Sequence, residues 1–281
     1  MIKGKVRDIY DEGNTLLIIS TNRLSAFDRP ICDIPCKGVV LNQLAAWWFE
    51  KTQSIIQNHV LELPNANSMR VKKCRVLPIE IVIRGYITGS TNTSLWTLYQ
   101  QGEREVFGNR LPDGLRKNQK LPHPILTPTT KSSEHDRPLN QEDMTKIPHL
   151  TPALWEKIKT TALVLYQFAN DDLAQKNLLL ADTKYEFGLD DSNQLCLIDE
   201  IHTPDSSRYW DISEWEQAFA ANRDPASYDK EIIRLWYTAH CDPYQIQELP
   251  KAPLELIQQV SQRYQALLTK ITGKSAVCAE S

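Results

Sequence analysis

Apolar residues recur at helical spacing in several stretches of this chain. From Leu41 to Ile56, leucine, alanine, tryptophan and isoleucine return every three or four positions, which predicts a helix with one buried side. A second stripe follows Thr151-Pro152, a pair typical of a helix N-terminus. The other predicted helices are residues 212–220, 228–239 and a last one opened by Pro253 and stopped by Gly273.

Shorter runs rich in β-branched and aromatic residues predict strands. Lys3–Tyr10 and Thr15–Ser20 form a predicted N-terminal hairpin. Val71–Ile87 has the composition of two strands separated at Pro78, because proline cannot donate a ladder hydrogen bond. On the second of these strands, alternation places Glu80, Val82 and Arg84 on one face.

The break at Pro78 suggests a hinge near residues 76–79. We therefore predict a β-rich N-terminal lobe over residues 1–77 and a larger α+β lobe over residues 78–281. Residues 112–138 hold five prolines and cannot form a regular helix. A connection of this length is usually functional or disordered.

The richest chemistry lies between Asp182 and Trp210. On a strand, Asp182, Lys184 and Glu186 share one face. The run 194–201 is expected to fold back as a hairpin, and a two-residue turn would place Glu186 opposite Asp199. Two carboxylates about 4 Å apart repel by roughly 4 kcal/mol at an effective dielectric of about 20, so a cation is expected there.

Two interpretations of that hairpin remain open. Its oxygen ligands suit Mg²⁺, which takes one or two protein carboxylates and completes its shell with water and phosphate. Alternatively, the hairpin is a solvated charged surface on which Lys184 neutralises a neighbour. The following loop favours the first interpretation, because Ser206, Ser207 and Arg208 provide hydroxyl and guanidinium donors for a phosphate or carboxylate.

Other polar groups allow a functional and a structural interpretation. Lys3, Lys5 and Arg7 alternate onto one strand face, where they either hold a polyphosphate or keep an exposed strand soluble. Lys131, His135 and Asp136 are either substrate contacts or ordinary surface residues. No GxxxxGK[ST] or GxGxxG motif is present, so a nucleotide must be held mainly by side chains and strands.

Composition limits the class of protein. The 281 residues are 41% hydrophobic and 24% charged, as in soluble globular proteins, and the net charge of −3 argues against a general nucleic-acid or membrane-surface binder. No apolar run reaches the ~18 residues of a membrane span, and the first residues lack a signal-like apolar core, so we expect a cytoplasmic protein. The six cysteines form no CxxC pair and are interpreted as free thiols.

Taken together, ordered motifs across residues 4–236 resemble the SAICAR synthetase family (phosphoribosylaminoimidazole-succinocarboxamide synthase). They are GKVRDIY (4–10), LSAFD (24–28), KGVVLNQL (37–44), VIRGYITGS (82–90), LPHPILTPTTK (121–131), HD (135–136), DTKYEFG (182–188), DEIHTPDSSRYW (199–210) and DKEIIRLW (229–236). Residues 240–281 carry no motif that we can place.

The resemblance implies an ATP-grasp-like, two-lobed α+β fold that closes over ATP. It implies an ATP- and Mg²⁺-dependent ligase of purine biosynthesis, which joins L-aspartate to carboxyaminoimidazole ribotide (CAIR) and gives SAICAR, ADP and phosphate through an acyl phosphate. Such chemistry depends on positioning and charge neutralisation. The partners implied are these small molecules, and the oligomeric state is left open.

The resemblance also implies roles for individual residues. Lys5 and Arg7 correspond to ATP phosphate contacts, and the segment from Val76 to Glu80 corresponds to the adenine hinge. Glu186 and Asp199 correspond to the metal carboxylates, and Asp182, Lys184 and Lys131 to catalytic residues beside the transferred phosphate. The implied substrate contacts are Ser25, Asp28, Arg84, Ser90, His135, Asp136, Ser206, Ser207 and Arg208.

Two other classes share part of this pattern. A small-molecule kinase would use the same metal and phosphate contacts with a hydroxyl acceptor and without aspartate. A non-catalytic regulator would bind ATP without turnover. Dependence of ADP release on aspartate separates these classes from the ligase.

Overall fold

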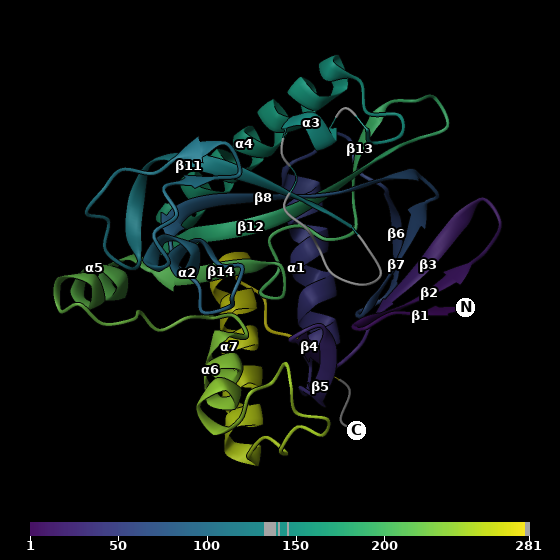
Figure 1. Ribbon diagram of the computed structural model, residues 1–281. Helices are drawn as coiled ribbons and strands as arrows, with labels where there is room; N and C mark the ends of the chain where they lie inside the picture. The colour runs from purple at the N-terminus through teal and green to yellow at the C-terminus, as the bar shows by residue number, and fades with distance from the viewer. Residues whose placement is uncertain (132–138, 140, 145, 279–281) are drawn as a thin grey trace.

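The computed structural model describes residues 1–131, 139, 141–144 and 146–278 (Figure 1). Over these residues the strands form two five-stranded antiparallel sheets and two small hairpins. The N-terminal sheet has the order β1 (Ile2–Lys3), β2 (Arg7–Asp11), β3 (Thr15–Ser20), β7 (Ser68–Lys72), β6 (Val60–Asn65). The central sheet has the order β11 (Gln119–Thr130), β8 (Arg75–Ile87), β12 (Leu178–Leu189), β13 (Leu195–Ile198), with β14 (Ser207–Asp211) also on β12. The hairpins are β4 (Arg23–Ala26) with β5 (Arg29–Asp33) and β9 (Glu105–Val106) with β10 (Asn109–Arg110).

The α+β class is confirmed, and the two sheets fall on either side of residues 73–74. The exact extents of the two lobes, 1–77 and 78–281, stay a prediction.

Two strand predictions were wrong in detail. Lys3–Tyr10 is not one strand, because Gly4 turns the chain and its N–H donates to Arg7 O at 2.8 Å. Strand β8 runs unbroken through Pro78. Its missing N–H is tolerated because Pro78 lies where the register with β12 shifts, between Glu186 and Gly188, and a bulge is where a sheet accepts proline.

The β12–β13 hairpin has a three-residue loop instead of the predicted two-residue turn. Asp190 N–H donates to Gln194 O at 3.1 Å, and Asn193 takes a left-handed φ of 57° that completes the turn. The register moves by one residue, so Glu186 faces Ile198 and not Asp199. Asp199 nevertheless reaches Glu186, because it follows the strand end in a left-handed conformation with φ 68°.

The predicted helices are present with shifted ends. Residues 212–220 and 254–272 match the prediction, whereas the first helix begins and ends earlier than predicted. Thr151 caps its helix by accepting a hydrogen bond from Leu154 N at 3.2 Å. The helices are α1 (Lys37–Lys51), α2 (Leu95–Gln100), α3 (Gln141–Met144), α4 (Pro152–Ala174), α5 (Ile212–Ala220), α6 (Glu231–His240) and α7 (Leu254–Thr272). Residues 119–130 of the proline-rich segment form β11, with a bulge between Lys120 and Ile125. The prediction that this segment is not a regular helix is confirmed for residues 112–131.

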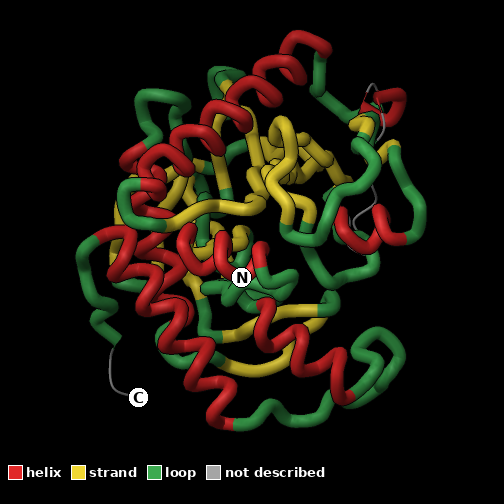
Figure 2. Tube along the Cα trace, turned by 90° about the vertical axis from the view of Figure 1, so that its left-hand side faces the viewer, coloured by secondary structure: helices red, strands yellow, loops and turns green. Residues whose placement is uncertain are grey.

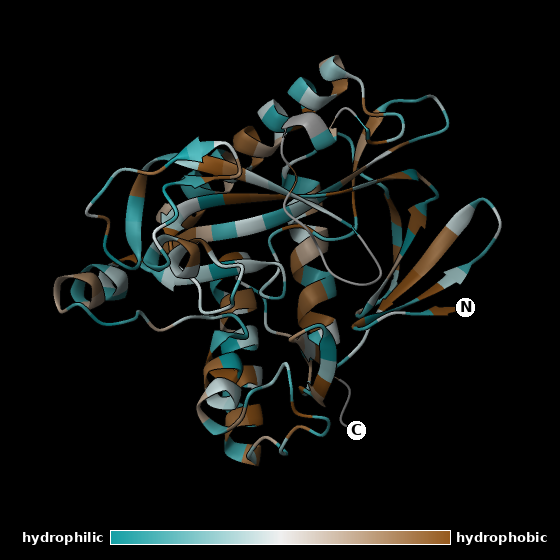
Figure 3. Ribbon diagram, in the orientation of Figure 1, coloured by the Kyte–Doolittle hydropathy of each residue, from teal (hydrophilic) through white to brown (hydrophobic). Residues whose placement is uncertain are grey.

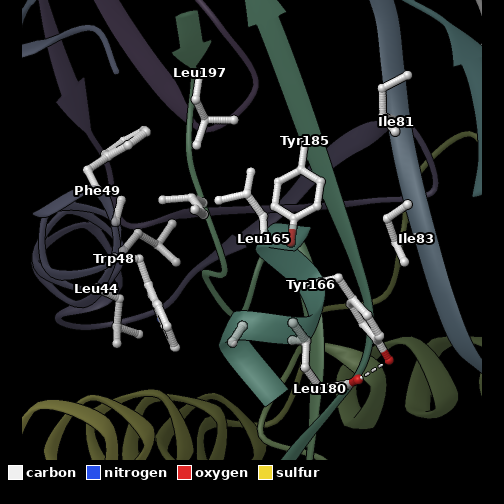
Figure 4. Close-up of a cluster of buried hydrophobic side chains, with 14 of the residues drawn as sticks. Leu44, Trp48, Phe49, Ile81, Ile83, Leu165, Tyr166, Leu180, Tyr185 and Leu197 are labelled. Atoms are coloured by element: carbon white, nitrogen blue, oxygen red, sulfur yellow. Dashed lines mark hydrogen bonds between the residues drawn. The ribbon is translucent and has the colours of Figure 1, made fainter. Parts of the chain in front are cut away.

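Helix α4 covers one face of the central sheet, and Trp215 of α5 packs against Tyr86 and Trp210 at one end of the opposite face. Helix α4 packs on β8 and β12, while α1, α6 and α7 pack together below the sheet (Figures 1 and 2). Hydrophobic residues gather on α1 and α7 (Figure 3). Trp48 and Phe49 of α1 point toward Tyr185 of β12, and Tyr166 of α4 donates to Leu180 O at 2.6 Å (Figure 4). Trp48 and Phe49 are therefore core residues.

The prediction that all six cysteines are free thiols was wrong. Cys36 and Cys278 form a disulfide across 242 residues, which joins the start of α1 to the segment after α7. Such a long-range pair leaves no trace in local spacing. Cys32, Cys74, Cys196 and Cys241 are free.

No helix in the described part of the chain combines the length and the apolar character that crossing a membrane requires.

Two buried histidines lead to a prediction about acid stability. Burial lowers the pKa of His59 to about 4 and that of His202 to about 3. Because these folded-state values lie below the unfolded value of about 6.5, the unfolded chain takes up protons first as the pH falls, and stability present above pH 6.5 is lost below it. Each histidine should cost about 2 kcal/mol between pH 7 and pH 5.

Urea unfolding of the wild type and of His59→Leu at pH 7 and pH 5 measures this loss. We expect the variant to lose about 2 kcal/mol less than the wild type between the two pH values. His123→Gln, at an exposed position on β11, is the control. An equal loss in wild type and His59→Leu would contradict the prediction.

Candidate active site

A cavity of about 440 Å³ opens on the face of the central sheet opposite α4. Segments far apart in the chain line it: the β4–β5 turn, β8, β12, the start of β14 and the start of α6. The turn carries strain, because Phe27 and Asp28 both adopt left-handed φ values of 54° and 61°.

The floor of the cavity consists of cross-strand neighbours on β8 and β12. Arg84 lies opposite Asp182, Val82 opposite Lys184, and Glu80 opposite Glu186. The predicted shared faces are thus confirmed. Because directly opposed side chains on one sheet face lie about 5 Å apart, the two polar stripes form a single charged surface.

Lys184 is the centre of this surface. Its Nζ lies 2.9 Å from Glu80, 2.5 Å from Glu186 and 3.7 Å from Asp199. Lys131 also contacts Glu186, from the segment after β11. Burial opposes the charge of Lys184, but Glu186 and Asp199 outweigh it and raise its pKa well above the usual value. The structure is therefore compatible with both interpretations of the hairpin, the metal site and the neutralised charged surface. Lys184 neutralises the same carboxylates that could bind a metal.

Arg7 connects the N-terminal sheet to these carboxylates. It pairs with Asp199 and, at 2.5 Å, with Glu200. Burial alone would raise the pKa of Asp199, but Arg7 and Lys184 hold it below its usual range, so Asp199 is ionised. Burial and the neighbouring Asp199 instead raise the pKa of Glu186. The pKa values of these two adjacent carboxyl groups are thus shifted in opposite directions. An additional cation beside them would stabilise the ionised form of both.

The donor set fits Mg²⁺ as a partly solvated ion. Among the described residues, no three His, Cys, Asp or Glu side chains converge as a complete metal site. Glu186 and Asp199 supply two carboxylates in contact with each other, which is the number that Mg²⁺ takes when phosphate and water fill its other positions.

A second charged group surrounds Arg208. Its guanidinium lies 2.8 Å from Asp182, 3.6 Å from Asp229 and 3.3 Å from Glu231. Arg84 lies 3.9 Å from the same Asp182 carboxylate and donates to Thr127 at 3.1 Å. Both guanidinium groups are thus held by neighbouring side chains at one end of the cavity, where a planar donor can bind a phosphate or carboxylate in a bidentate manner.

The structure distributes the other predicted residues unevenly. Lys5, Ser25, Asp28, Ser206 and Ser207 line the cavity, with Lys5 3.6 Å from Asp28. The prediction that Lys3, Lys5 and Arg7 share one strand face was wrong, because Lys3 lies on β1, Arg7 on β2 and Lys5 in the turn between them.

Six of the predicted positions do not line that cavity, and two cannot be placed. The six are Arg7, Val76, Ser90, Lys131, Glu186 and Asp199. Ser90 lines a neighbouring cavity of about 710 Å³ and hydrogen-bonds Glu231. Val76 is 47% exposed, and Glu186 is almost wholly buried beneath Lys131 and Lys184. His135 and Asp136 lie outside the described residues.

Several residues in or beside the cavity were given no role from the sequence. Buried Lys37 and Asp205 form an ion pair at 2.7 Å, and Tyr264 of α7 donates to Asp205 at 2.8 Å. Lys230 and Arg234 of the DKEIIRLW motif also line the cavity. The sequence did carry a signal, since two cations lie four residues apart at the start of an amphipathic helix, but only the tertiary fold shows that they face the cavity.

Comparisons with known proteins agree over nearly the whole chain. A family model described as SAICAR synthetase matches residues 1–250. The phosphoribosylaminoimidazole-succinocarboxamide synthase of Legionella pneumophila (strain Paris) is 50% identical over 275 residues, covering 98% of this chain and 88% of that protein. The chloroplastic enzyme of the same name from Arabidopsis thaliana is 50% identical over 272 residues, covering 97% of this chain and 66% of that protein.

Solved structures show the same fold. A SAICAR synthase from Saccharomyces cerevisiae, complexed with SAICAR, has a TM-score of 0.81 at 30% identity and covers 98% of this chain and 95% of that chain. A SAICAR synthetase in complex with ADP has a TM-score of 0.74 at 23% identity and covers 98% of each chain, which supports the fold. By its sequence profile, its relatives and its fold, the chain belongs to the SAICAR synthetase family.

Proposed function

We propose that this chain is an ATP-dependent ligase that joins L-aspartate to CAIR and releases SAICAR, ADP and phosphate in the cytoplasm. The CAIR carboxylate attacks the γ-phosphorus of ATP, and ADP leaves. The aspartate amine then attacks the acyl phosphate carbon, phosphate leaves, and the amine proton passes to solvent or a nearby base. The observation that carries the proposal is the Lys184-centred group of carboxylates on the floor of the cavity, opened at its edge to Arg7.

The roles of the residues follow from charge and position. Glu186 and Asp199 would hold Mg²⁺, which when bound neutralises charge on the transferred phosphate. Arg7 already pairs with Asp199 and Glu200. It can therefore contact an ATP phosphate bound beside Asp199 and keep its ion pairs with these two carboxylates. Lys184 and Lys131 stabilise the charge that develops between the donor and acceptor oxygens.

The other end of the cavity suits the ribotide. Arg84 and Arg208 supply two guanidinium groups for its phosphate, and Asp182 both orients them and offers a hydrogen-bond acceptor to ribose hydroxyls. Ser206 and Ser207 add hydroxyl donors beside Lys184. The backbone N–H of Lys184 donates a hydrogen bond to the backbone O of Ser206 at 3.1 Å. Substrate and nucleotide would thus meet over Lys184.

A coupled ADP assay tests the proposal against the kinase alternative. With ATP, Mg²⁺ and CAIR present, we expect ADP release in equal amounts with SAICAR only when L-aspartate is added. A kinase would release ADP at the same rate without aspartate, and a regulator would release none. Either result would overturn the proposal.

A further inference from the structure

We infer that Cys74 and Cys196 form an oxidation site, at which hydrogen peroxide closes a disulfide that slows turnover. Cys74 lies in the short link between β7 of the N-terminal sheet and β8 of the central sheet, and Cys196 lies on β13. The effect on turnover rests on the proposed function, whereas the disulfide chemistry does not depend on it.

The two cysteines approach each other across Gly188 of β12. Gly188 lies opposite Cys196 on β13 and opposite Val76 on β8, so it separates the strands that carry or follow the two thiols. A Cβ atom at Gly188 would lie only 3.0 Å from Cys74 Cβ. Glycine therefore leaves the space through which the Cys74 side chain reaches Cys196, whose S–H donates a hydrogen bond to Cys74 Sγ.

The environment makes Cys74 the more reactive thiol of the pair. The hydrogen bond from Cys196, aided by the charge of Lys72, outweighs partial burial and lowers the pKa of Cys74. The same hydrogen bond, together with burial, raises the pKa of Cys196, which is wholly buried. Cys32 is also half-buried, but burial raises its pKa to about 11. Because the thiolate is the nucleophile, Cys74 is expected to react first.

Oxidation of the pair needs hydrogen peroxide as its only co-reactant. The Cys74 thiolate attacks one peroxide oxygen, the O–O bond breaks, hydroxide leaves, and Cys74 becomes a sulfenic acid. The thiolate that raised the pKa of Cys196 is then gone. Cys196 gives up its proton and its sulfur attacks Cys74 Sγ, so that the S–O bond breaks and water is released. The two sulfur atoms lose two electrons, which reduce the peroxide.

The new bond would tie together two segments that lead to the proposed nucleotide site. From Cys74 the chain enters the segment from Val76 to Glu80, and from Cys196 it runs along β13 to Asp199. Disulfide sulfur atoms are about 2.05 Å apart, about 1.5 Å closer than two thiols in contact. Closing the bond therefore draws the start of β8 toward β13. A displacement of about 1 Å at a reacting centre can lower a rate on the order of 10²-fold.

Peptide mass mapping after treatment of the whole protein with hydrogen peroxide tests the disulfide directly. We expect a linked pair of peptides that contain Cys74 and Cys196, which dithiothreitol separates again. Cys74→Ser and Cys196→Ala should each abolish this link. Cys32→Ser is the matched control, because it removes a thiol of similar exposure on β5, and it should form the link as the wild type does.

Aspartate-dependent ADP release, measured on the same samples, tests the consequence. We expect peroxide to lower the wild-type rate about tenfold or more and dithiothreitol to restore it, whereas Cys74→Ser and Cys196→Ala keep their untreated rates. Untreated protein in dithiothreitol is the reference, because this reagent also reaches the Cys36–Cys278 disulfide.

Two results would overturn the inference: oxidation that leaves Cys74 and Cys196 unlinked, or a linked protein that turns over at the untreated rate. ADP release that ignored aspartate but still fell when the link formed would contradict the ligase function and support the oxidation site. The mass of the linked peptides thus keeps a failure of the oxidation site distinct from a failure of the proposed function.

Discussion

Asp199→Asn is expected to lower kcat by about 10²- to 10³-fold or more while the protein stays folded. The change removes one of the two carboxylates that would hold Mg²⁺ and leaves Glu186 alone at the site. Asparagine is chosen because it keeps the shape of the side chain and, like aspartate, tolerates the left-handed φ of 68° at this position. Arg7 still keeps Glu200, at 2.5 Å, as a partner.

A magnesium titration of the ADP assay shows whether the loss concerns the metal. We expect the variant to need a much higher Mg²⁺ concentration, with a circular dichroism spectrum equal to that of the wild type. Asp191→Asn, an exposed position in the turn of the same hairpin, should retain full activity. Near-normal turnover of Asp199→Asn at low Mg²⁺ would refute the metal assignment.

The sequence predicted local faces better than it predicted register. Alternation was enough to place Asp182, Lys184 and Glu186 together, because the period of a strand is two whatever its partner. The position of Asp199 required the loop type, and a single additional loop residue moved the pairing by one. Its contact with Glu186 was predicted correctly for a wrong reason, since a left-handed turn, and not cross-strand pairing, brings it there.

Long-range features were out of reach for a different reason. Nothing near Cys36 indicates that residue 278 returns to it, and nothing near Asp205 indicates that Lys37 and Tyr264 will enclose it. These contacts depend on how α7 packs against α1, which tertiary packing decides. They also give the C-terminal segment, which carried no recognisable motif, a structural role, because α7 supports the wall of the cavity through Tyr264.

Lys184→Met should have the largest combined effect on stability and activity. Lys184 is the cation shared by Glu80, Glu186 and Asp199, so methionine keeps its length but leaves three carboxylates in mutual repulsion. Removing one partner from a buried pair costs about 3–5 kcal/mol. The Lys184 side chain is 23% exposed and Lys131 remains beside Glu186, so we expect a smaller loss of about 1–3 kcal/mol in unfolding free energy. We expect kcat to fall by about 10²- to 10⁴-fold, because the transferred phosphate loses the central cation that would neutralise its developing charge.

Mg²⁺ and ADP separate the electrostatic cause from a packing defect. If repulsion among the carboxylates destabilises Lys184→Met, saturating Mg²⁺ with ADP should raise its melting temperature by more than that of the wild type, because the added cation replaces the missing charge. Activity should remain low, since the lysine that we propose contacts the transferred group is gone. Lys176→Met, which removes a lysine paired with Asp172 on the α4 side of the sheet, should show neither effect. An equal rise in melting temperature for Lys184→Met and wild type would mean that Lys184 is held there by packing, and that Mg²⁺ does not bind at the carboxylates it now neutralises.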